Sequence, residues 1–336
     1  MRTDDGDKDS MDKKGIAALL VSAGLVAVAS GETKVGIIGC DTSHTIAFAK
    51  TLNVDKPAFA ADFRVTAAHK WGSKDIVSST NRYEKYIAQL KEMGVEMCET
   101  VDDLLAKVDV VCLETNDGRE HLWQAEKCFQ ARKRVFIDKP IAQDYPHAKA
   151  IYDLGRRYGA EYFSTSTLRY ADSNAVARAS GVRFASCLFF APSPLETQGT
   201  HSRYVWYGIH AFETAMTVMG RGAASVRAYT AGVNDFVTIT WADGRVANLK
   251  LDQKSWNYGG YAFPPKGKPV ALCGPKGYEP MLENAILPFF RTGVVPVPHE
   301  ETLEIFAIMD AAAKSHAEGG REVAISEITE GKGQTR

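Results

Sequence analysis

A lysine followed by a proline ends one of the most strand-like segments of this sequence. Residues 135–137, Val-Phe-Ile, are β-branched or aromatic, and Asp138, Lys139 and Pro140 follow them directly. A buried strand that stops at Lys-Pro carries an ammonium group to the carboxyl edge of a sheet, where open α/β sheets bind their ligands. There the ammonium could stabilise negative charge on a reacting oxygen. An isolated Lys-Pro more often marks a surface loop, so the neighbouring elements must decide between the two interpretations.

A histidine in the second half of the chain has the right chemistry for the complementary proton transfer. His210 lies near the start of an amphipathic helix that we expect over 207–219, with Gly220 as its C-terminal cap. Removal of hydride from a carbinol carbon leaves an oxygen whose proton must also go, and histidine accepts protons near neutral pH. A helix histidine bonded to a backbone carbonyl is the alternative that the sequence leaves open.

A glycine turn follows the first expected strand, at the place where a dinucleotide fold binds pyrophosphate. Such folds have Gly-x-Gly-x-x-Gly in this turn. Here Gly39, Asp41 and His44 occupy the three glycine positions. Asp41 could cap the next helix, while Thr42 and Ser43 could donate to a phosphate or a sugar. Because an aspartate also adds negative charge beside a dianionic ligand, tight pyrophosphate binding stays open at this point.

Basic residues follow the second expected strand, which covers 63–68. His69, Lys70 and Lys74 lie close together in the sequence, with Ser73 between the two lysines. These groups could meet the 2′-phosphate of NADP at the end of the strand. A solvated basic loop is the alternative.

Strands and helices alternate through the first half of the chain. Apolar runs predict strands over 34–40, 63–68, 108–113, 135–137 and 162–168. Helical spacing predicts helices over 43–52, 83–93, 100–105, 120–130 and 148–158. This alternation indicates βαβ units and a parallel sheet.

Beyond Arg169 the pattern becomes that of an antiparallel sheet. Longer strands are expected over 182–190, 225–231, 236–241 and 245–251. Asp243-Gly244 between the last two is a strong hairpin signal. Residues 258–280 are rich in proline and glycine and predict an irregular loop with one short strand over 270–273, and a helix over 300–317 follows.

Composition excludes several classes of function. The chain has 336 residues, and 40 basic against 41 acidic side chains give a net charge of 40 − 41 = −1, so nothing favours nucleic acid or an anionic membrane as partner. Its six cysteines form no Cys-x-x-Cys pair, which argues against zinc and redox motifs. His201, His210 and Glu213 do not form a convincing ligand set, so we expect no metal site.

The N-terminal segment resembles a secretory leader. Residues 11–14 include two lysines, residues 15–29 are mostly apolar, and Ala27 and Ala29 suit a cleavage site. We therefore expect a signal peptide that starts at Met11, and a periplasmic or secreted protein. A hydrophobic N-terminal helix on a cytoplasmic protein is the alternative.

Four short motifs together resemble the Gfo/Idh/MocA oxidoreductase family over nearly the whole chain after the leader. They are Val-Gly-Ile-Ile-Gly-Cys at 35–40, Ile-Asp-Lys-Pro-Ile-Ala at 137–142, Leu-Arg-Tyr at 168–170 and Gly-Ile-His at 208–210. The resemblance implies an α/β fold, in which a Rossmann-type parallel-sheet domain precedes a C-terminal α+β domain with a large, mostly antiparallel sheet. We place the leader at 1–31, the Rossmann-type domain at 32–165 and the substrate domain at 166–330.

The resemblance also implies roles for particular residues. Lys139 and His210 would flank the reacting carbon, and Asn116 and His121 would lie on the nicotinamide side of the cofactor. The expected cofactor is NADP or NAD, and the candidate cofactor-binding residues are Gly39, Asp41, Thr42, Ser43, His44, Lys70, Ser73, Asn116, His121 and Lys139.

Four further residues are candidates for substrate binding. Arg169 and Tyr170 lie at the domain junction, where they could reach the substrate or form a structural ion pair. Tyr207 lies in an aromatic stretch that suits a carbohydrate ring or ordinary packing. Glu213 follows His210 by about one helical turn and could orient it.

These observations favour an NAD(P)-dependent oxidoreductase that acts on a sugar or polyol. One alternative is an exported carbohydrate-active hydrolase, lyase or epimerase with a retained or absent nicotinamide cofactor. Another is a non-catalytic sugar-binding protein. We also expect a homo-oligomer, because the open face of an antiparallel sheet often needs a partner to cover it.

Overall fold

The computed structural model describes residues 31–195 and 200–331. The predicted leader lies outside the described residues, apart from Gly31 at its end. Among the described residues, no helix combines the length and the apolar character needed to cross a bilayer.

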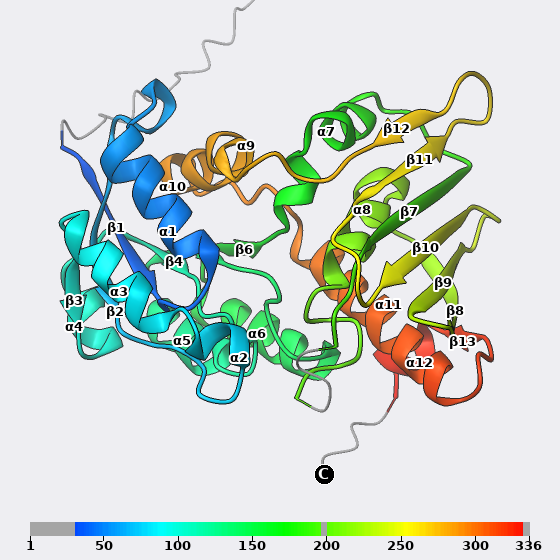
Figure 1. The fold of residues 1–336 in the computed structure, drawn as a ribbon, viewed down its shortest axis with the longest axis horizontal. Coiled ribbons are helices and arrows are strands. Elements are labelled where there is room, and N and C mark those ends of the chain that lie inside the picture. The colour runs from blue at the N-terminus through cyan, green and yellow to red at the C-terminus, as the bar shows by residue number, and fades with distance from the viewer. Residues whose placement is uncertain (1–30, 196–199, 332–336) are drawn as a thin grey trace, which may run out of the picture. The chain divides into compact units, whose positions relative to one another are not determined.

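The first half of the chain forms a six-stranded sheet in the order β3-β2-β1-β4-β5-β6 (Figure 1). Every neighbouring pair in this sheet is parallel. The strands are β1 (Thr33–Ile38), β2 (Phe63–His69), β3 (Glu96–Cys98), β4 (Val110–Leu113), β5 (Arg134–Ile137) and β6 (Tyr162–Ser164). Because all six strands run the same way, the loops after β1, β4, β5 and β6 meet at one edge.

Helices cover both faces of this sheet. The connecting helices are α1 (Ser43–Lys50), α2 (Val77–Thr80), α3 (Tyr83–Glu92), α4 (Val101–Leu105), α5 (His121–Gln130) and α6 (Tyr145–Tyr158), and α1 continues as a π-helical turn, Thr51–Asp55. Alternate strand residues divide between two cores: α4, α5 and α6 pack on one face, and α1 and α3 on the other. This is the arrangement that the βαβ pattern predicts.

The second half of the chain forms a seven-stranded sheet in the order β12-β11-β7-β10-β9-β8-β13. Its strands are β7 (Ser186–Pro192), β8 (Ala223–Ala231), β9 (Asn234–Trp241), β10 (Val246–Asp252), β11 (Gly259–Phe263), β12 (Val270–Leu272) and β13 (Val323–Ala324). Only β7 and β10 pair in parallel, so the sheet is mostly antiparallel as expected. The predicted fold class is therefore confirmed.

One face of the second sheet packs on two long helices, α8 (Ile209–Met219) and α11 (His299–Ala317). The remaining helices of this half are α7 (Asp172–Ala179), α9 (Glu279–Met281), α10 (Leu287–Thr292) and α12 (Ser326–Thr329). On the opposite face of the sheet Leu188, Phe190 and Tyr261 are exposed.

The segment with α9 and α10 returns to the first sheet. Met281, Leu282, Phe289 and Phe290 are buried in the same core as α1. The chain therefore crosses between the two sheets after β12, and a residue of the late sequence such as Tyr278 can lie close to the β1 turn. The boundaries at 165 and 166 do not describe this return.

Three sequence-based expectations for secondary structure are corrected. The strand expected over 162–168 ends at Ser164, because Ser166 caps a 3-10 helix, Thr167–Tyr170. Part of the expected loop is strand β11. A Cβ on Gly260 would lie 2.1 Å from the Leu188 carbonyl oxygen, so this strand requires the glycines that argue against it by propensity. The third concerns residues 279–292, which are helical although the end of the expected loop includes 279 and 280 and no helix is predicted after it.

Candidate active site

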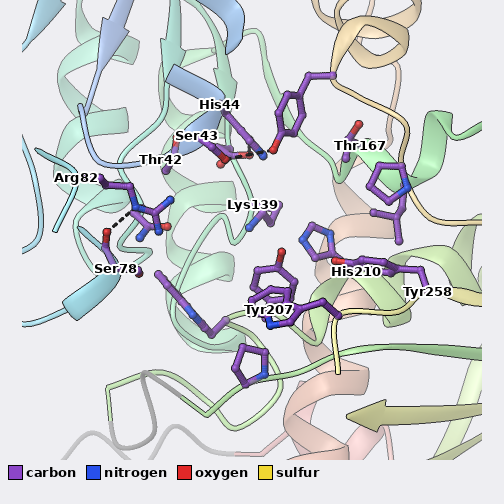
Figure 2. Close-up of a pocket in the computed structure, with 18 residues that line it drawn as sticks. Thr42, Ser43, His44, Ser78, Arg82, Lys139, Thr167, Tyr207, His210 and Tyr258 are labelled. Atoms are coloured by element: carbon purple, nitrogen blue, oxygen red, sulfur yellow. Dashed lines mark hydrogen bonds and ion pairs between the residues drawn. The ribbon is translucent and has the colours of Figure 1, made fainter. Parts of the chain in front are cut away.

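A cavity of about 400 Å³ opens at the carboxyl edge of the first sheet (Figure 2). From the strand-end loops it is lined by Thr42, Ser43, His44, Asn116, Asp138 and Lys139. From the second half of the chain it is lined by Trp206, Tyr207, His210, Trp256, Tyr258 and Tyr278. The cavity thus lies where polar groups from both halves meet.

Lys139 follows β5 by two residues and lies in this cavity. Its Nζ lies 5.3 Å from the centre of the Tyr207 ring, a cation–π contact. Within the described residues the ammonium group makes no ion pair with a carboxylate. Its positive charge is therefore available to a ligand.

His210 lies in the first turn of α8 and faces the same cavity (Figure 2). Its Nδ1 lies 2.7 Å from Ser166 Oγ, which also accepts the Leu168 N–H. Burial lowers the pKa of His210 well below its usual value, and the nearby charges of Lys139 and His44 act in the same direction. The imidazole is neutral at neutral pH.

The β1 turn requires Gly39 and uses Asp41 in an unexpected way. Gly39 has φ +98°, and a Cβ there would lie 2.5 Å from the Thr115 backbone nitrogen. Thr42, not Asp41, caps α1, because its hydroxyl accepts the Thr45 N–H.

The Asp41 carboxylate does not line the cavity and holds three loops together. It accepts the backbone N–H of Ser73 at 2.9 Å and that of Asn116 at 3.0 Å. Burial raises the pKa of Asp41. Direct binding of the cofactor by Asp41 stays a prediction.

Three other predicted cofactor residues also lie outside the cavity lining. Lys70 forms an ion pair with Glu99. Ser73 Oγ donates to Asp75 and Asp117. His121 is fully buried, with its ring nitrogens 3.1 Å from the Ile141 carbonyl oxygen and 2.7 Å from that of Thr115. Their contacts within the protein give each of them a structural role.

The predicted substrate residues divide in the same way. Tyr207 lines the cavity, whereas Arg169, Tyr170 and Glu213 do not. Arg169 is buried and pairs with Glu213 at 2.9 Å and with Glu301 at 2.6 Å, so the structural ion pair is the interpretation that its contacts support. Glu213 is occupied by Arg169 and Thr165, and Ser166 instead contacts the His210 ring.

Sequence reasoning missed part of the cavity wall. Glu114 and Asp138 end β4 and β5 beside His44, and the positions of both acids directly after buried strands could have identified them. Arg82, Tyr258 and Tyr278 gave no such signal, because loops far apart in the sequence bring them to the cavity.

Residues 33–166 match the model of a family described as an oxidoreductase family with an NAD-binding Rossmann fold, Gfo/Idh/MocA. Over these residues the chain matches the Gfo/Idh/MocA oxidoreductase family. The resemblance inferred from the four motifs is thereby confirmed, and so is an oxidoreductase with a nicotinamide-binding fold. A search of curated protein sequences found no match.

Solved structures of similar fold cover most of the chain. A probable dehydrogenase from Thermotoga maritima has a TM-score of 0.71 at 17% identity, covering 88% of this chain and 99% of that one. Scyllo-inositol dehydrogenase from Lactobacillus casei, with bound NAD(H) and scyllo-inositol, has a TM-score of 0.68 at 15% identity and covers 88% and 99%. Myo-inositol dehydrogenase from the same organism, with NAD(H) and myo-inositol, has a TM-score of 0.68 at 14% identity, covering 87% and 96%. At these identities the likeness shows the shared Gfo/Idh/MocA fold.

The residues around the α1 N-terminus fit the pyrophosphate of a nicotinamide dinucleotide. Thr42, Ser43 and Arg82 line the cavity there, and they supply hydroxyl, amide and guanidinium donors to an anion. Asn116 and Lys139 line the same cavity. These five residues would hold the cofactor in this Gfo/Idh/MocA protein.

Proposed function

We propose that this oxidoreductase uses NAD to oxidise or reduce a sugar or polyol, with Lys139 and His210 on either side of the reacting carbon. The observation that carries the proposal is that these two side chains, 71 positions apart in the sequence, line one cavity with the α1 N-terminus. When bound, the cofactor supplies the hydride acceptor or donor at this carbon.

His210 is suited to accept the hydroxyl proton during oxidation. Its pKa is lowered well below the usual value, so the ring is neutral and can take a proton. When Nδ1–H donates to Ser166 Oγ, Nε2 is left as the acceptor, and within the described residues Nε2 makes no hydrogen bond. Ser166 is thus a positioning residue for the base.

Lys139 is suited to stabilise the developing oxyanion. Its ammonium group is held against the Tyr207 ring, and within the described residues it pairs with no carboxylate. A cation fixed before the reaction stabilises new negative charge without rearranging solvent. In the reverse direction the same charge would polarise a carbonyl oxygen.

The facing wall supports a polyol or a sugar as the substrate class. Tyr207 and Trp256 pack edge to face with ring centres 5.1 Å apart, and Tyr258 lies beside His210. Aromatic faces cover the C–H groups of a carbohydrate ring, while their polar ends meet hydroxyl groups. The inositol dehydrogenases of similar fold bind ligands of this chemistry.

The end of β2 supports NAD as the preferred cofactor. The sequence predicts that Lys70 favours NADP, but its ammonium group pairs with Glu99. His69 contacts the Cys98 carbonyl oxygen, and burial lowers its pKa, so it too carries little positive charge. A 2′-phosphate would find few available cations at these two residues.

Cofactor binding and turnover together test the proposal. The purified protein would be titrated with NAD and NADP by calorimetry, then assayed for NADH formation with a panel of inositols, other polyols and aldoses. We expect tighter binding of NAD and turnover of at least one polyol or sugar. His210→Asn should lower kcat about 10²–10⁴-fold while leaving the Kd for NAD within a few-fold.

Two outcomes would overturn this function. Conversion of a sugar or glycoside without a net change in NADH, with NAD released on denaturation, would identify an epimerase, lyase or hydrolase that retains its cofactor. Failure to bind either dinucleotide, with no turnover across the panel, would identify a sugar-binding protein.

We further propose that the protein is exported and forms a homo-oligomer. Export rests on the leader-like segment that starts at Met11. Oligomerisation is supported by the exposed Leu188, Phe190 and Tyr261 on the open sheet face. Cell fractionation and light scattering of the purified protein check these two proposals.

A further inference from the structure

Three side chains of types that bind metal ions meet at the cavity wall. His44 comes from α1, Glu114 from the end of β4 and Asp138 from the end of β5. His44 Nδ1 lies 2.9 Å from Asp138 Oδ1 and 3.8 Å from Glu114 Oε2. All three residues are buried, and one ligand atom from each lies within 4.8 Å of the others.

Glu114 is the unexplained member of this cluster. Its side chain is fully buried, and in the described part of the chain neither carboxylate oxygen has a hydrogen-bond partner. A buried carboxylate that is charged and unpaired strongly destabilises a folded protein. A native protein rarely retains such a group without an ion, a proton or water beside it.

His44 and Asp138 contact each other, with Nδ1 2.9 Å from Oδ1, and His44 lowers the pKa of Asp138. Neither of these two atoms makes a hydrogen bond of good geometry among the described residues. Glu114 therefore lies beside a histidine–aspartate pair that does not donate to it.

The spacing of these atoms suits a metal ion. Metal–ligand distances of about 2.0–2.2 Å in a tetrahedral zinc site separate the ligand atoms by about 3.3–3.6 Å. The two observed separations from His44, 2.9 and 3.8 Å, lie on either side of that range. Three protein ligands that leave one coordination position open are typical of catalytic rather than structural zinc sites.

We propose that His44, Glu114 and Asp138 bind one divalent transition-metal ion of the Zn²⁺ class, with its open coordination position facing the cavity. His44 and Asp138 line the cavity, whereas Glu114 supports the site from behind. The ion would act as a Lewis acid for a substrate hydroxyl group beside Lys139.

Lys139 is the competing cation and does not neutralise the cluster by direct contact. Its ammonium group lies against Tyr207, and among the described residues it forms no ion pair with Glu114 or Asp138.

Metal content and zinc titration of the full-length protein test the site. The wild-type protein, dialysed against a chelator, would be titrated with Zn²⁺ by calorimetry and, separately, with Co²⁺ to record its visible absorption bands. We expect one Zn²⁺ ion to bind tightly per protein chain. The visible absorption bands of bound Co²⁺ should be those of a four- or five-coordinate ion. Glu114→Gln, which preserves shape, should weaken Zn²⁺ binding by more than about 100-fold, since loss of outer-shell partners alone costs 10–100-fold.

His201→Gln is the matched control. His201 is also a buried histidine beside an acid, 3.5 Å from Asp117, but it does not line the cavity. This variant should bind Zn²⁺ as the wild type does. His44→Asn serves as the second site variant if Glu114→Gln does not fold by circular dichroism.

If the wild-type protein binds no Zn²⁺ ion tightly, the proposal is overturned, and Glu114 is then a buried acid that keeps its proton. Equal zinc affinity in the wild type and the folded site variants also overturns it, because the zinc would then be bound elsewhere. Both readouts are independent of NAD binding, so the metal site and the proposed activity can fail separately.

Discussion

Two buried clusters of charged residues in this protein differ in how their charges are paired: His44, Glu114 and Asp138 form the strand-end cluster, and Arg169, Glu213 and Glu301 form the junction cluster. In the junction cluster, Arg169 directly contacts Glu213 and Glu301. In the strand-end cluster, Glu114 contacts no donor among the described residues. The junction cluster lies outside the cavity lining, whereas the strand-end cluster forms part of the cavity wall.

The difference separates structural charge from functional charge. A buried charge with its partner in place is compensated within the protein, and removal of the partner leaves an uncompensated buried charge. A buried acid without a partner is costly to the fold, and it is retained where a ligand, a metal or a proton completes it. Whether a buried acid has a partner inside the protein therefore indicates its role better than the type of residue does.

Loss of Arg169 should have the largest effect of the variants considered. Arg169→Met leaves Glu213 buried without its counter-charge, and we expect the free energy of unfolding to fall by about 3–5 kcal/mol. Urea denaturation followed by fluorescence measures it. The double variant Arg169→Met with Glu213→Gln should recover part of the loss. A loss below about 1 kcal/mol would show that the junction cluster is not structural.

Loss of Lys139 should affect activity rather than stability. Lys139→Met removes the charge that faces the substrate, and kcat/KM should fall about 10²–10³-fold, or about 2.7–4 kcal/mol. Its free energy of unfolding should change by less than about 1 kcal/mol, because no ion pair in the described residues is broken. Lys276→Met, which removes a surface partner of Asp172, is the control and should retain full activity.

Glu114 should make the metal-free protein less stable as the pH rises. Burial, with Asp138 nearby, raises its pKa well above 4.5, so the folded state holds the proton more tightly than the unfolded state. Stability is then fully present below about pH 4.5 and falls above it, by up to about 1.4 kcal/mol per pH unit. Glu114→Gln has no such proton to lose.

Unfolding of both proteins in the presence of a chelator, from about pH 5 to pH 8, checks this dependence. The stability of Glu114→Gln relative to the wild type should increase across the range. An identical pH dependence in the two proteins would mean that Glu114 has a charged partner in solution.

Lys70 should give the smallest effect and supplies the exposed reference for the two buried clusters. Lys70 pairs with Glu99, whose side chain is exposed to solvent. Lys70→Met should therefore change the free energy of unfolding by less than about 1 kcal/mol. We expect the preference for NAD over NADP to stay unchanged. A loss of NADP affinity above about tenfold would indicate that Lys70 leaves Glu99 to meet a 2′-phosphate.

The sequence by itself determined the parallel sheet and the edge at which ligands meet it. Apolar runs that end at Gly39, Asn116 and Lys139 place these residues after parallel strands, and the direction of those strands brings them to one edge. The four family motifs added His210. These signals are local or periodic, which is why they can be read without the fold.

Only the tertiary structure decided which polar groups are already occupied. Asp41 accepts two backbone amides, Lys70 pairs with Glu99, and Glu213 pairs with Arg169 rather than orienting His210. Each partner lies at least 29 positions away in the sequence, a separation at which periodicity carries no information. Glu114 is the converse case: its sequence context is that of a buried strand end, and its lack of a partner follows from how α1, β4 and β5 pack around it.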